Sequence, residues 1–310
     1  MKPQFDLYFA GYYSDEIEDI IMQNGYNKLL SNINERKGIA RYVEAKKNGS
    51  FKGKLLIDSG AFSVHKSGKT VDLEDYINFL NENHEWLDYY IQLDDIPGKW
   101  GVPRTKEELL ASPPKTWENY LYMRSRLIEP DKLLPVFHQG EDYKYLKQML
   151  EYRDENGKKI EYLCISSNKD LDAKKRYEWY KHCYEIIERS SNPNVKVHSL
   201  GTQSEKHCEL LPFTSVDATS WIMTAANGNL YSKWGTITIS DRQLGKKENI
   251  VNKNSYNIFK QHIEEKGFTW EDLQTKSSER IRWNMLYLGE WARNEREYKG
   301  PKTFKSGRLF

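Results

Sequence analysis

Three aspartates stand where short apolar runs of the sequence end. Asp58 closes the stretch KLLID, Asp94 lies in YYIQLDD and Asp217 in FTSVD. In α/β enzymes, catalytic groups sit at the carboxyl ends of buried parallel strands. Two carboxylates facing one molecule suit chemistry at an acetal-like carbon, with one as nucleophile and the other handling the leaving group's proton. The three aspartates can equally bind Mg²⁺, and Asp58 taken alone is better explained by a helix cap or a turn, because these are so common.

The elements that would position these residues alternate along the whole chain. Each of eight strand-like runs is rich in apolar, aromatic or β-branched residues, and most of them precede a segment of helical periodicity. The runs cover residues 5–13, 54–62, 88–96, 132–140, 160–167, 195–201, 213–219 and 235–240. Such alternation implies parallel βαβ units, and eight of them predict an α/β fold of the (β/α)8 TIM-barrel type. An open doubly wound sheet is the alternative, but no G-x-G-x-x-G motif follows the first run.

Helical spacing predicts helices between these runs and at the end of the chain. The expected helices cover residues 15–30, 72–87, 116–128, 143–153, a stretch through 177–187, 255–266 and 277–293. A polar segment at 98–116, with several prolines, is expected to lack regular structure. Neither an internal repeat nor a low-complexity linker occurs, so we predict a single domain over residues 1–310, with 251–310 as its C-terminal helical part.

Composition limits the class of protein. The chain has 310 residues and a formal net charge of +2, so no overall basic field points to nucleic acid. Its three cysteines lie far apart without a Cys-x-x-Cys spacing, which favours a reducing compartment. Because no run approaches membrane-spanning length and no signal-like apolar stretch opens the chain, we expect a cytoplasmic protein without a membrane partner.

A barrel would bring the last residues of its strands to one rim. In six of the eight runs these residues include polar or small ones: Asp58 and Ser59, Asp94 and Asp95, His138 to Gly140, Ser166 and Ser167, Leu200 to Thr202, and Asp217. Several carboxylates on one rim repel each other, which costs stability unless function or pairing offsets it. The barrel therefore favours catalytic or binding roles for Asp58, Asp94 and Asp217 over caps and turns.

An ordered set of motifs resembles the tRNA-guanine transglycosylase family. LLIDSGAFS is similar to the family's D-S-G-G-F/Y-Q motif, IQLDDI to its F-D-E segment, VFHQG to V-Q-G, and SVDATSW to the F-D-C-V segment that bears the nucleophile. CISSNKD and LGTQSE stand where the family carries I-G-G-L and a G-V-G-T-P-E type loop. AANGNLYSKWGTITISD resembles A-R-N-G-x-L-F-T-x-x-G-x-I-N-I-x-N. The resemblance covers residues 58–241 and implies a (β/α)8 barrel.

The resemblance also implies a role for each matched residue. Asp217 would be the nucleophile that displaces guanine and holds the sugar at C1′, and Asp58 the general acid/base. The remaining matched residues would surround the base, by stacking, hydrogen bonds or close backbone approach: Ser59, Phe62, Asp94, Gln139, Gly140, Ser166, Ser167, Leu200 and Gly201. Ser166 and Ser167 replace two family glycines, and their hydroxyls could read a substituent on the base. No cofactor is implied.

Departures from the family bear on the substrate. The family's C-x-C-x-x-C…H zinc motif should follow Asp241, but RQLGKKENIVNKNSYN contains no cysteine, so we expect no metal and no zinc-binding subdomain. Arginines of the family near the nucleophile are missing too, with Ala225 and Ala226 in that region. This divergence resembles the DpdA-type DNA-guanine transglycosylases, often phage-encoded, which insert 7-deazaguanines into DNA. The implied partners are guanine-containing DNA and a free 7-deazaguanine, in the host cytoplasm if the chain is phage-encoded.

Three alternatives to a DNA transglycosylase stay open. A tRNA enzyme without zinc would perform the same chemistry on RNA, and a hydrolase would let water release the intermediate. A non-catalytic nucleic-acid-binding barrel is disfavoured, because paired carboxylates beside phosphates weaken binding. The sequence leaves open an auxiliary protein, the oligomeric state, the base inserted, and whether Asp94 or Asp95 faces the pocket.

Overall fold

The larger sheet of the protein is a ring of parallel strands. The computed structural model describes residues 5–67, 70–99, 101–103, 105–168, 170–202, 204–240, 253–294 and 299–303. The strands of this sheet are β1 (Asp6–Ala10), β2 (Asn27–Ser31), β3 (Leu55–Asp58), β4 (Tyr89–Ile91), β5 (Leu133–Leu134), β6 (Val136–His138), β7 (Tyr162–Ser166), β8 (Lys196–Leu200) and β9 (Ser215–Ala218). They lie in the order β5-β4-β3-β2-β1-β9-β8-β7-β6, and every pair is parallel.

The two ends of this sheet are neighbours in sequence. Only Pro135 separates β5 from β6, and proline has no N–H to give to a ladder. Its carbonyl still accepts a hydrogen bond from the backbone N–H of Cys164 on β7, at 2.7 Å. The sheet is therefore a nearly closed barrel in which β5 and β6 act as one interrupted strand, which gives the TIM-barrel-like α/β architecture expected from the sequence.

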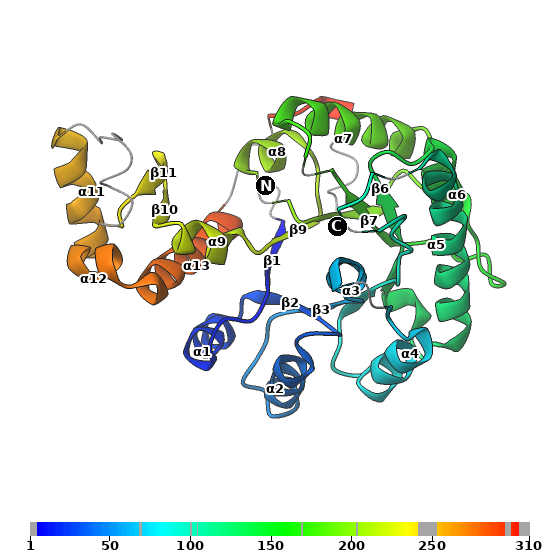
Figure 1. Ribbon diagram of the computed structural model, residues 1–310, viewed down its shortest axis with the longest axis horizontal. Helices are drawn as coiled ribbons and strands as arrows, with labels where there is room; N and C mark the ends of the chain where they lie inside the picture. Colours follow the sequence, from blue (N-terminus) through cyan, green and yellow to red (C-terminus); the bar gives the residue numbers. More distant parts are fainter. Residues whose placement is uncertain are drawn as a thin grey trace. The chain divides into compact units, whose positions relative to one another are not determined.

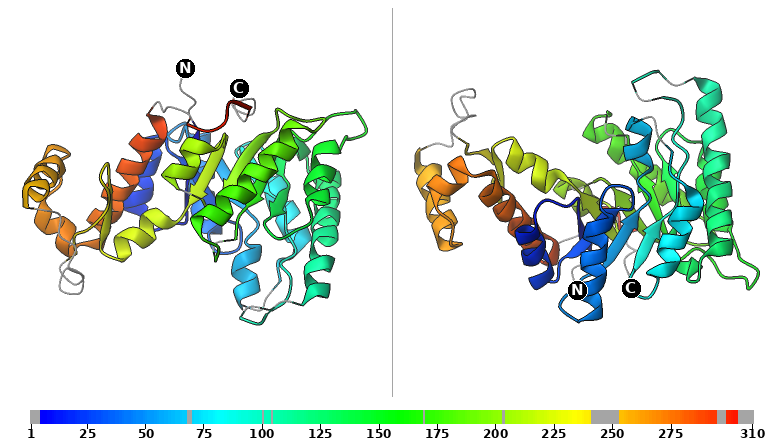
Figure 2. Two further views of the ribbon diagram at one scale, coloured as in Figure 1. Left: turned by 90° about the horizontal axis from the view of Figure 1, so that it is seen from above. Right: turned by 60° about the horizontal axis from the view of Figure 1, so that its bottom comes forward.

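Helices surround the barrel (Figure 1). They are α1 (Asp15–Gln23), α2 (Arg36–Lys47), α3 (Ala61–Ser67), α4 (Leu73–Glu82), α5 (Lys106–Arg126), α6 (Tyr143–Glu151), α7 (Ala173–Glu188) and α8 (Glu205–Leu210), with a 3-10 turn η1 (Pro130–Lys132). All but α3 form the outer ring. The short helix α3 lies inside that ring in Figure 1, and Figure 2 shows it at one end of the barrel.

Period-two alternation along the strands fills the barrel. The buried hydrophobic residues inside it form one cluster: Tyr8, Ala10, Leu29, Leu56, Ile91, Leu134, Val136, Tyr162 and Cys164. Continuing the same alternation places Asp58, His138, Ser166 and Asp217 on the inner face nearer the carboxyl ends. The apolar layers therefore support a polar layer at the mouth.

A second compact unit comprises Thr219–Asn294, and the first comprises Met1–Ala218 with Glu295–Phe310. The second unit holds α9 (Ser220–Ala226), α11 (Lys253–Glu265), α12 (Trp270–Thr275), α13 (Ser277–Arg293) and an antiparallel hairpin of β10 (Asn229–Ser232) and β11 (Gly235–Thr238). It has a core of its own, built from Leu230, Ile239, Phe259, Ile263, Phe268, Trp270, Leu273 and Trp283. The expected C-terminal helices are confirmed by α11 and α13. The single domain expected from the sequence stays a prediction.

The predicted number of barrel strands contains two errors that cancel: strand β2 was missed, and the run at 235–240 was wrongly counted. The helix expected over 15–30 ends at Gln23, where Asn24 and Gly25 turn the chain into strand β2. Gly25 has φ +59°, and the Asn-Gly pair is a turn signal that the helical spacing of the isoleucines obscured. The run at 235–240 is not a barrel strand, because β11 pairs with its neighbour β10 instead. Seven of the eight expected runs lie in the barrel.

The expectation that residues 98–116 lack regular structure is wrong for its second half. Helix α5 begins at Lys106 with a capping box, in which Thr105 and Glu108 each accept the other's backbone N–H. The helix continues through Pro113 and Pro114, and next to them it is hydrogen-bonded to the segment that follows β4. There the backbone N–H of Asp95 donates to the Thr116 hydroxyl at 2.9 Å.

No helix among the described residues is both long and apolar enough to cross a membrane.

Candidate active site

Asp58 and Asp217 lie at the same end of the barrel. Asp58 is the last residue of β3, Asp217 is the third of four residues in β9, and all barrel strands are parallel. The two carboxylates are close enough for the charge of Asp217 to raise the pKa of Asp58. The mouth of the barrel thus brings together the two residues that the sequence predicts as acid/base and nucleophile.

The turn after β3 fixes the Asp58 carboxylate. Gly60 has φ +83°, and a Cβ there would come within 2.7 Å of the Ile33 side chain, so this turn requires glycine. The Gly60 N–H donates to Asp58 Oδ2 at 3.0 Å. The chain then enters α3 directly, so that the strand, the carboxylate and the helix over the mouth follow within a few residues.

The surroundings of Asp58 favour its neutral form. Burial, followed by the negative charge of Asp94, raises the pKa of Asp58 to about 7 from its ordinary value of 3.8, against the opposing hydrogen bond from Gly60. Asp217 and Glu35 add smaller contributions in the same direction. A carboxyl group with a pKa near neutrality can both donate and accept a proton, as a general acid/base must.

Asp94 belongs to a charged triad with His138 and Glu141. The Nε2 atom of His138 lies 3.1 Å from Asp94 Oδ2, and its Nδ1 atom lies 3.0 Å from Glu141 Oε1. Burial alone would lower the pKa of His138, but the hydrogen bonds to Asp94 and Glu141 outweigh it and raise the pKa to about 10. His138 is therefore an imidazolium at neutral pH, and it partly neutralises the acidic mouth.

The structure distinguishes Asp94 from Asp95. Asp94 contacts His138 and acts electrostatically on Asp58, whereas Asp95 pairs with Lys115 of α5 at 2.5 Å. Asp94 is thus the one that faces the mouth, and Asp95 faces the helix layer. Both residues lie in the segment that follows β4, which ends at Ile91.

Two nitrogen atoms lie within hydrogen-bond distance of the Asp217 carboxylate. His198 Nε2 lies 3.1 Å from Asp217 Oδ1, and the Gly201 backbone N–H donates to the same oxygen at 2.8 Å. The residue is 7% exposed. Among the described residues, both hydrogen bonds to this carboxylate end on Oδ1, so Oδ2 is left for a ligand.

The residues expected around a base differ in accessibility. Phe62, in the first turn of α3, is 60% exposed, which suits a stacking surface. Ser59 is fully buried and its hydroxyl accepts from the Ala61 N–H, so it caps the start of α3 and is not presented to the mouth. Ser166 is half-buried beside His138, whereas Ser167 is buried.

The loops after β6 and β8 supply the remaining predicted contacts. Gly140 is exposed with φ +109°, and nothing lies within 4 Å of the position of a Cβ, which leaves room for close approach. The side-chain oxygen of Gln139 accepts the Asn168 N–H at 2.9 Å. Leu200 is half-buried beside the apolar cluster, and Gly201 serves Asp217 through its N–H.

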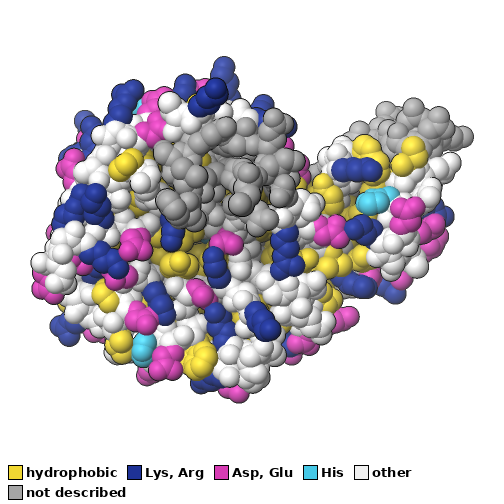
Figure 3. All heavy atoms as spheres, turned by 180° about the vertical axis from the view of Figure 1, so that it is seen from behind, with side chains coloured by type: hydrophobic (Ala, Val, Ile, Leu, Met, Phe, Trp, Pro, Cys, Tyr) yellow, Lys and Arg dark blue, Asp and Glu magenta, His cyan; other side chains and the backbone are white. Residues whose placement is uncertain are grey.

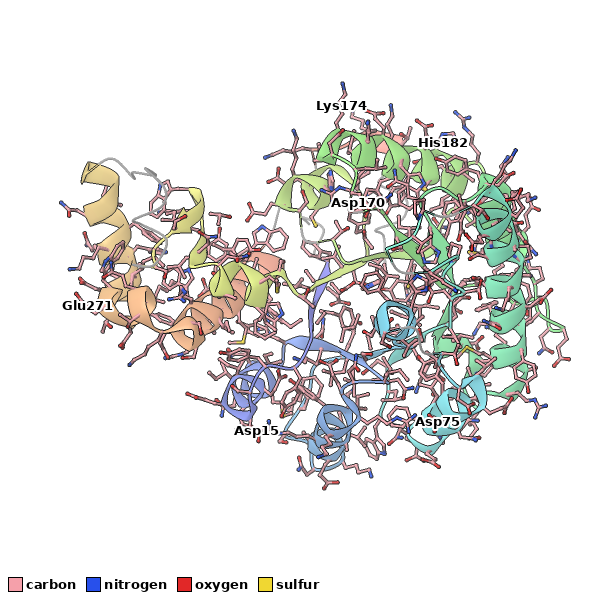
Figure 4. The ribbon with its side chains drawn as sticks, in the orientation of Figure 1. Asp15, Asp75, Asp170, Lys174, His182 and Glu271 are labelled. Atoms are coloured by element: carbon pink, nitrogen blue, oxygen red, sulfur yellow. The ribbon has the colours of Figure 1, made fainter. Side chains whose placement is uncertain are left out.

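No group of three or more His, Cys, Asp or Glu in the described part of the chain is arranged to hold a metal ion. The alternative of Mg²⁺ bound by Asp58, Asp94 and Asp217 therefore gains no support. Most of the segment expected to lack a zinc motif, residues 241–252, lies outside the described residues. Figure 4 shows His182 and Lys174 on the outer side of α7, away from the mouth.

Sequence reasoning missed two residues of the site, His198 and Ser215. His198 lies in the middle of β8 and is fully buried, and Ser215 precedes Asp217 by two residues on β9. Both could have been found by counting two residues back from a predicted site residue, His198 from Leu200 and Ser215 from Asp217, because residues two apart on a strand share a face.

No protein-family model matches the chain, and no curated protein matches it either. The fold and site define the class: a TIM-barrel-like α/β protein with an acidic mouth.

Proposed function

We propose that the protein is a base-exchange transglycosylase that replaces guanine in DNA by a 7-deazaguanine derivative. The observation that supports this most is the pair of carboxyl groups at one barrel mouth with opposite environments. Asp58 has a pKa raised to about 7 by burial and neighbouring charge, whereas Asp217 accepts two N–H donors on one oxygen. A proton carrier and a carboxyl nucleophile at the same mouth are what a double displacement at a sugar carbon requires.

The proposed reaction has two steps that mirror each other. Asp217 Oδ2 attacks C1′ of the nucleotide while the bond from C1′ to the base breaks, and Asp58 gives its proton to the departing guanine. The incoming 7-deazaguanine then attacks C1′, gives a proton back to Asp58 and releases the Asp217 carboxylate. The enzyme returns to its starting state without a cofactor.

The substrate assignment depends on the sequence resemblance. The motifs around Asp58 and Asp217 follow the guanine-transglycosylase order, and the missing zinc cysteines favour the DNA-modifying branch over the tRNA enzymes. A base inside a duplex must be flipped out before a barrel-mouth pocket can reach it, at a few kcal/mol. Phe62, 60% exposed beside Asp58 in sequence, is suited to stack on such a base.

Phosphate contacts would come from Lys and Arg side chains, so we expect DNA binding to weaken steeply as the salt concentration rises. Figure 3 shows the face of the barrel unit opposite the mouth, and over its described part acidic and basic side chains are interspersed.

The deciding experiment is base exchange in parallel on guanine-containing DNA, single- and double-stranded, and on tRNA. Radiolabelled guanine serves as incoming base, and a 7-deazaguanine then competes with it. The Asp217→Ala variant is the negative control, and Asp95→Ala the matched control, since Asp95 pairs with Lys115 away from the mouth.

Each outcome decides between the candidate functions. Label in DNA alone, absent with Asp217→Ala and retained with Asp95→Ala, supports the proposal. Label in tRNA alone assigns the same chemistry to RNA. Abasic sites without label identify a hydrolase, and no product on any nucleic acid rejects the proposed function.

A further inference from the structure

We propose that His198 is a positioning residue for Asp217, held as the neutral Nε2–H tautomer by a buried chain of hydroxyls from Ser215 and Tyr162. This inference rests on the proposed function, because its consequence concerns which oxygen of Asp217 attacks the sugar. His198 and Tyr162 lie outside the stretches that carry the resemblance, and Ser215 opens one of them, SVDATSW, but matches no letter of F-D-C-V.

The hydrogen-bonded series of side chains runs from the mouth into the barrel. Below Asp217 Oδ1, His198 presents Nε2 at 3.1 Å, and on its other side Nδ1 contacts the Ser215 hydroxyl. The same hydroxyl contacts the Tyr162 hydroxyl at 2.5 Å. The four residues come from three neighbouring strands, β7, β8 and β9, so the barrel itself sets their spacing.

The hydrogen bonds determine where the protons lie. Burial raises the pKa of Tyr162 well above its ordinary value, so this hydroxyl stays protonated and donates to Ser215. Ser215 must then give its own proton to Nδ1 of His198, which accepts it only when Nδ1 is unprotonated. The imidazole proton therefore stands on Nε2 and points to Asp217.

The opposite arrangement leaves a proton without an acceptor. If Nδ1 carried a proton, Ser215 would accept it and would have to donate to Tyr162. The Tyr162 proton would then need another acceptor, whereas Ser215 is the partner of this hydroxyl among the described residues. A buried donor without an acceptor costs roughly as much as several ordinary hydrogen bonds contribute, so the first arrangement is preferred.

Burial makes this hydrogen-bonded series of side chains rigid. His198 and Ser215 are fully buried, and the His198 ring packs edge-on against Tyr8 with centroids 5.8 Å apart. Water therefore does not replace the Nε2–H donor if it is removed. With Oδ1 fixed by His198 and Gly201, the carboxylate keeps one orientation, and Oδ2 is the attacking oxygen.

Two nearly isosteric variants isolate the donor to Asp217. The amide nitrogen in His198→Gln reaches the position of Nε2, whereas the shorter side chain in His198→Asn places its amide near Nδ1. His207→Asn is the matched control, because His207 is also buried but contacts the Ala173 carbonyl at 3.1 Å. The readouts are the single-turnover rate of covalent-intermediate formation, the KM for DNA, and the melting temperature.

We expect His198→Asn to slow formation of the intermediate roughly 10- to 100-fold, the effect of losing one hydrogen bond to a charged group, with KM within about twofold. His198→Gln should stay within roughly fivefold of the wild type, and His207→Asn should match it. If His198 had a purely structural role, both amide variants would form the intermediate at similarly reduced rates. Equal rates for His198→Asn and His198→Gln therefore overturn the inference.

A second measurement needs no substrate. In protein labelled with ¹⁵N-histidine, the His198 signals, assigned by their loss in His198→Gln, should show a protonated Nε2 and an unprotonated Nδ1 at pH 7.5. The Ser215→Ala variant should move the Nδ1 shift. A protonated Nδ1 overturns the inference even if base exchange is found. If the wild type exchanges no base, the proposed function fails while the spectrum still decides the tautomer.

Discussion

The carboxyl groups of Asp58 and Asp217, on two sides of the barrel mouth, have opposite environments. On the side of β3, Asp58 meets the charges of Asp94 and Glu35 and accepts one backbone N–H, from Gly60. On the side of β9, Asp217 meets an imidazole and a backbone N–H, both on one oxygen. One side therefore favours a carboxylic acid near neutral pH, and the other offers donors that stabilise a carboxylate.

The histidines on the two sides, His138 and His198, also differ in their environments. His138 lies between two carboxylates, Asp94 and Glu141, and its pKa rises to about 10. His198 lies between a carboxylate and a hydroxyl, Asp217 and Ser215, so a single Nε2–H is enough to complete its hydrogen bonds. Identical side chains thus serve as a cation on one side and as a neutral donor on the other. The environment, more than the residue type, assigns the roles.

The largest expected effect comes from removing the nucleophile. Asp217→Asn keeps the shape of the side chain and an oxygen that can accept from His198, but it lacks the carboxylate. We expect base exchange and the covalent intermediate to fall roughly 10⁴-fold or more. Denaturing gels that resolve the protein–DNA adduct measure this directly, and an adduct that persists in this variant would remove Asp217 from the nucleophile role.

Removing the proton carrier should cost less. Asp58→Asn leaves the nucleophile intact but cannot protonate the departing base, so the single-turnover rate should fall roughly 10²- to 10⁴-fold. A substrate whose leaving group needs no proton, such as a nucleoside with a cationic base, should recover most of the loss. Equal losses on both substrates would mean that Asp58 binds the substrate and does not carry the proton.

Sequence patterns predicted Asp58 and Asp217 because they stand at or near the ends of strands, where a single residue type is informative. They did not predict His198 and Ser215, since a buried polar residue within a strand resembles an ordinary core position until its neighbour on the adjacent strand is known. Strand β2 was missed because α1 and β2 share one apolar stripe across Asn24 and Gly25. Local periodicity can predict that residues 235–240 form a strand, but it does not show which strand they pair with. This is why the run was placed in the barrel, although β11 pairs with β10.

A smaller effect should follow from neutralising the charge beside Asp58. Asp94→Asn removes the largest electrostatic contribution that raises the pKa of Asp58, so that pKa should fall below about 7. Because the acid form is needed in the first step, the alkaline limb of the rate profile should move to lower pH, by about one unit, with a roughly three- to tenfold lower rate at pH 7.5. The matched variant Asp95→Asn should leave the profile in place; an equal shift in both would point to a general charge effect.

The smallest effect concerns stability on the β3 side of the mouth. The pKa of His138 is about 10 in the folded protein against an ordinary 6.5, so its contribution to stability is complete below pH 6.5 and is lost as the pH rises through 10. Because the ring is 29% exposed, we expect only about 1–2 kcal/mol, or a few degrees in melting temperature.

His138→Gln should flatten this fall between pH 6.5 and 10 relative to the wild type, whereas His198→Gln should not, since His198 needs no second proton for its hydrogen bonds. Melting curves at four pH values give the difference between variants, in which the titration of tyrosines and lysines cancels. If both variants flattened the fall equally, the two imidazoles would carry the same charge. The contrast between the two sides of the mouth would then be wrong.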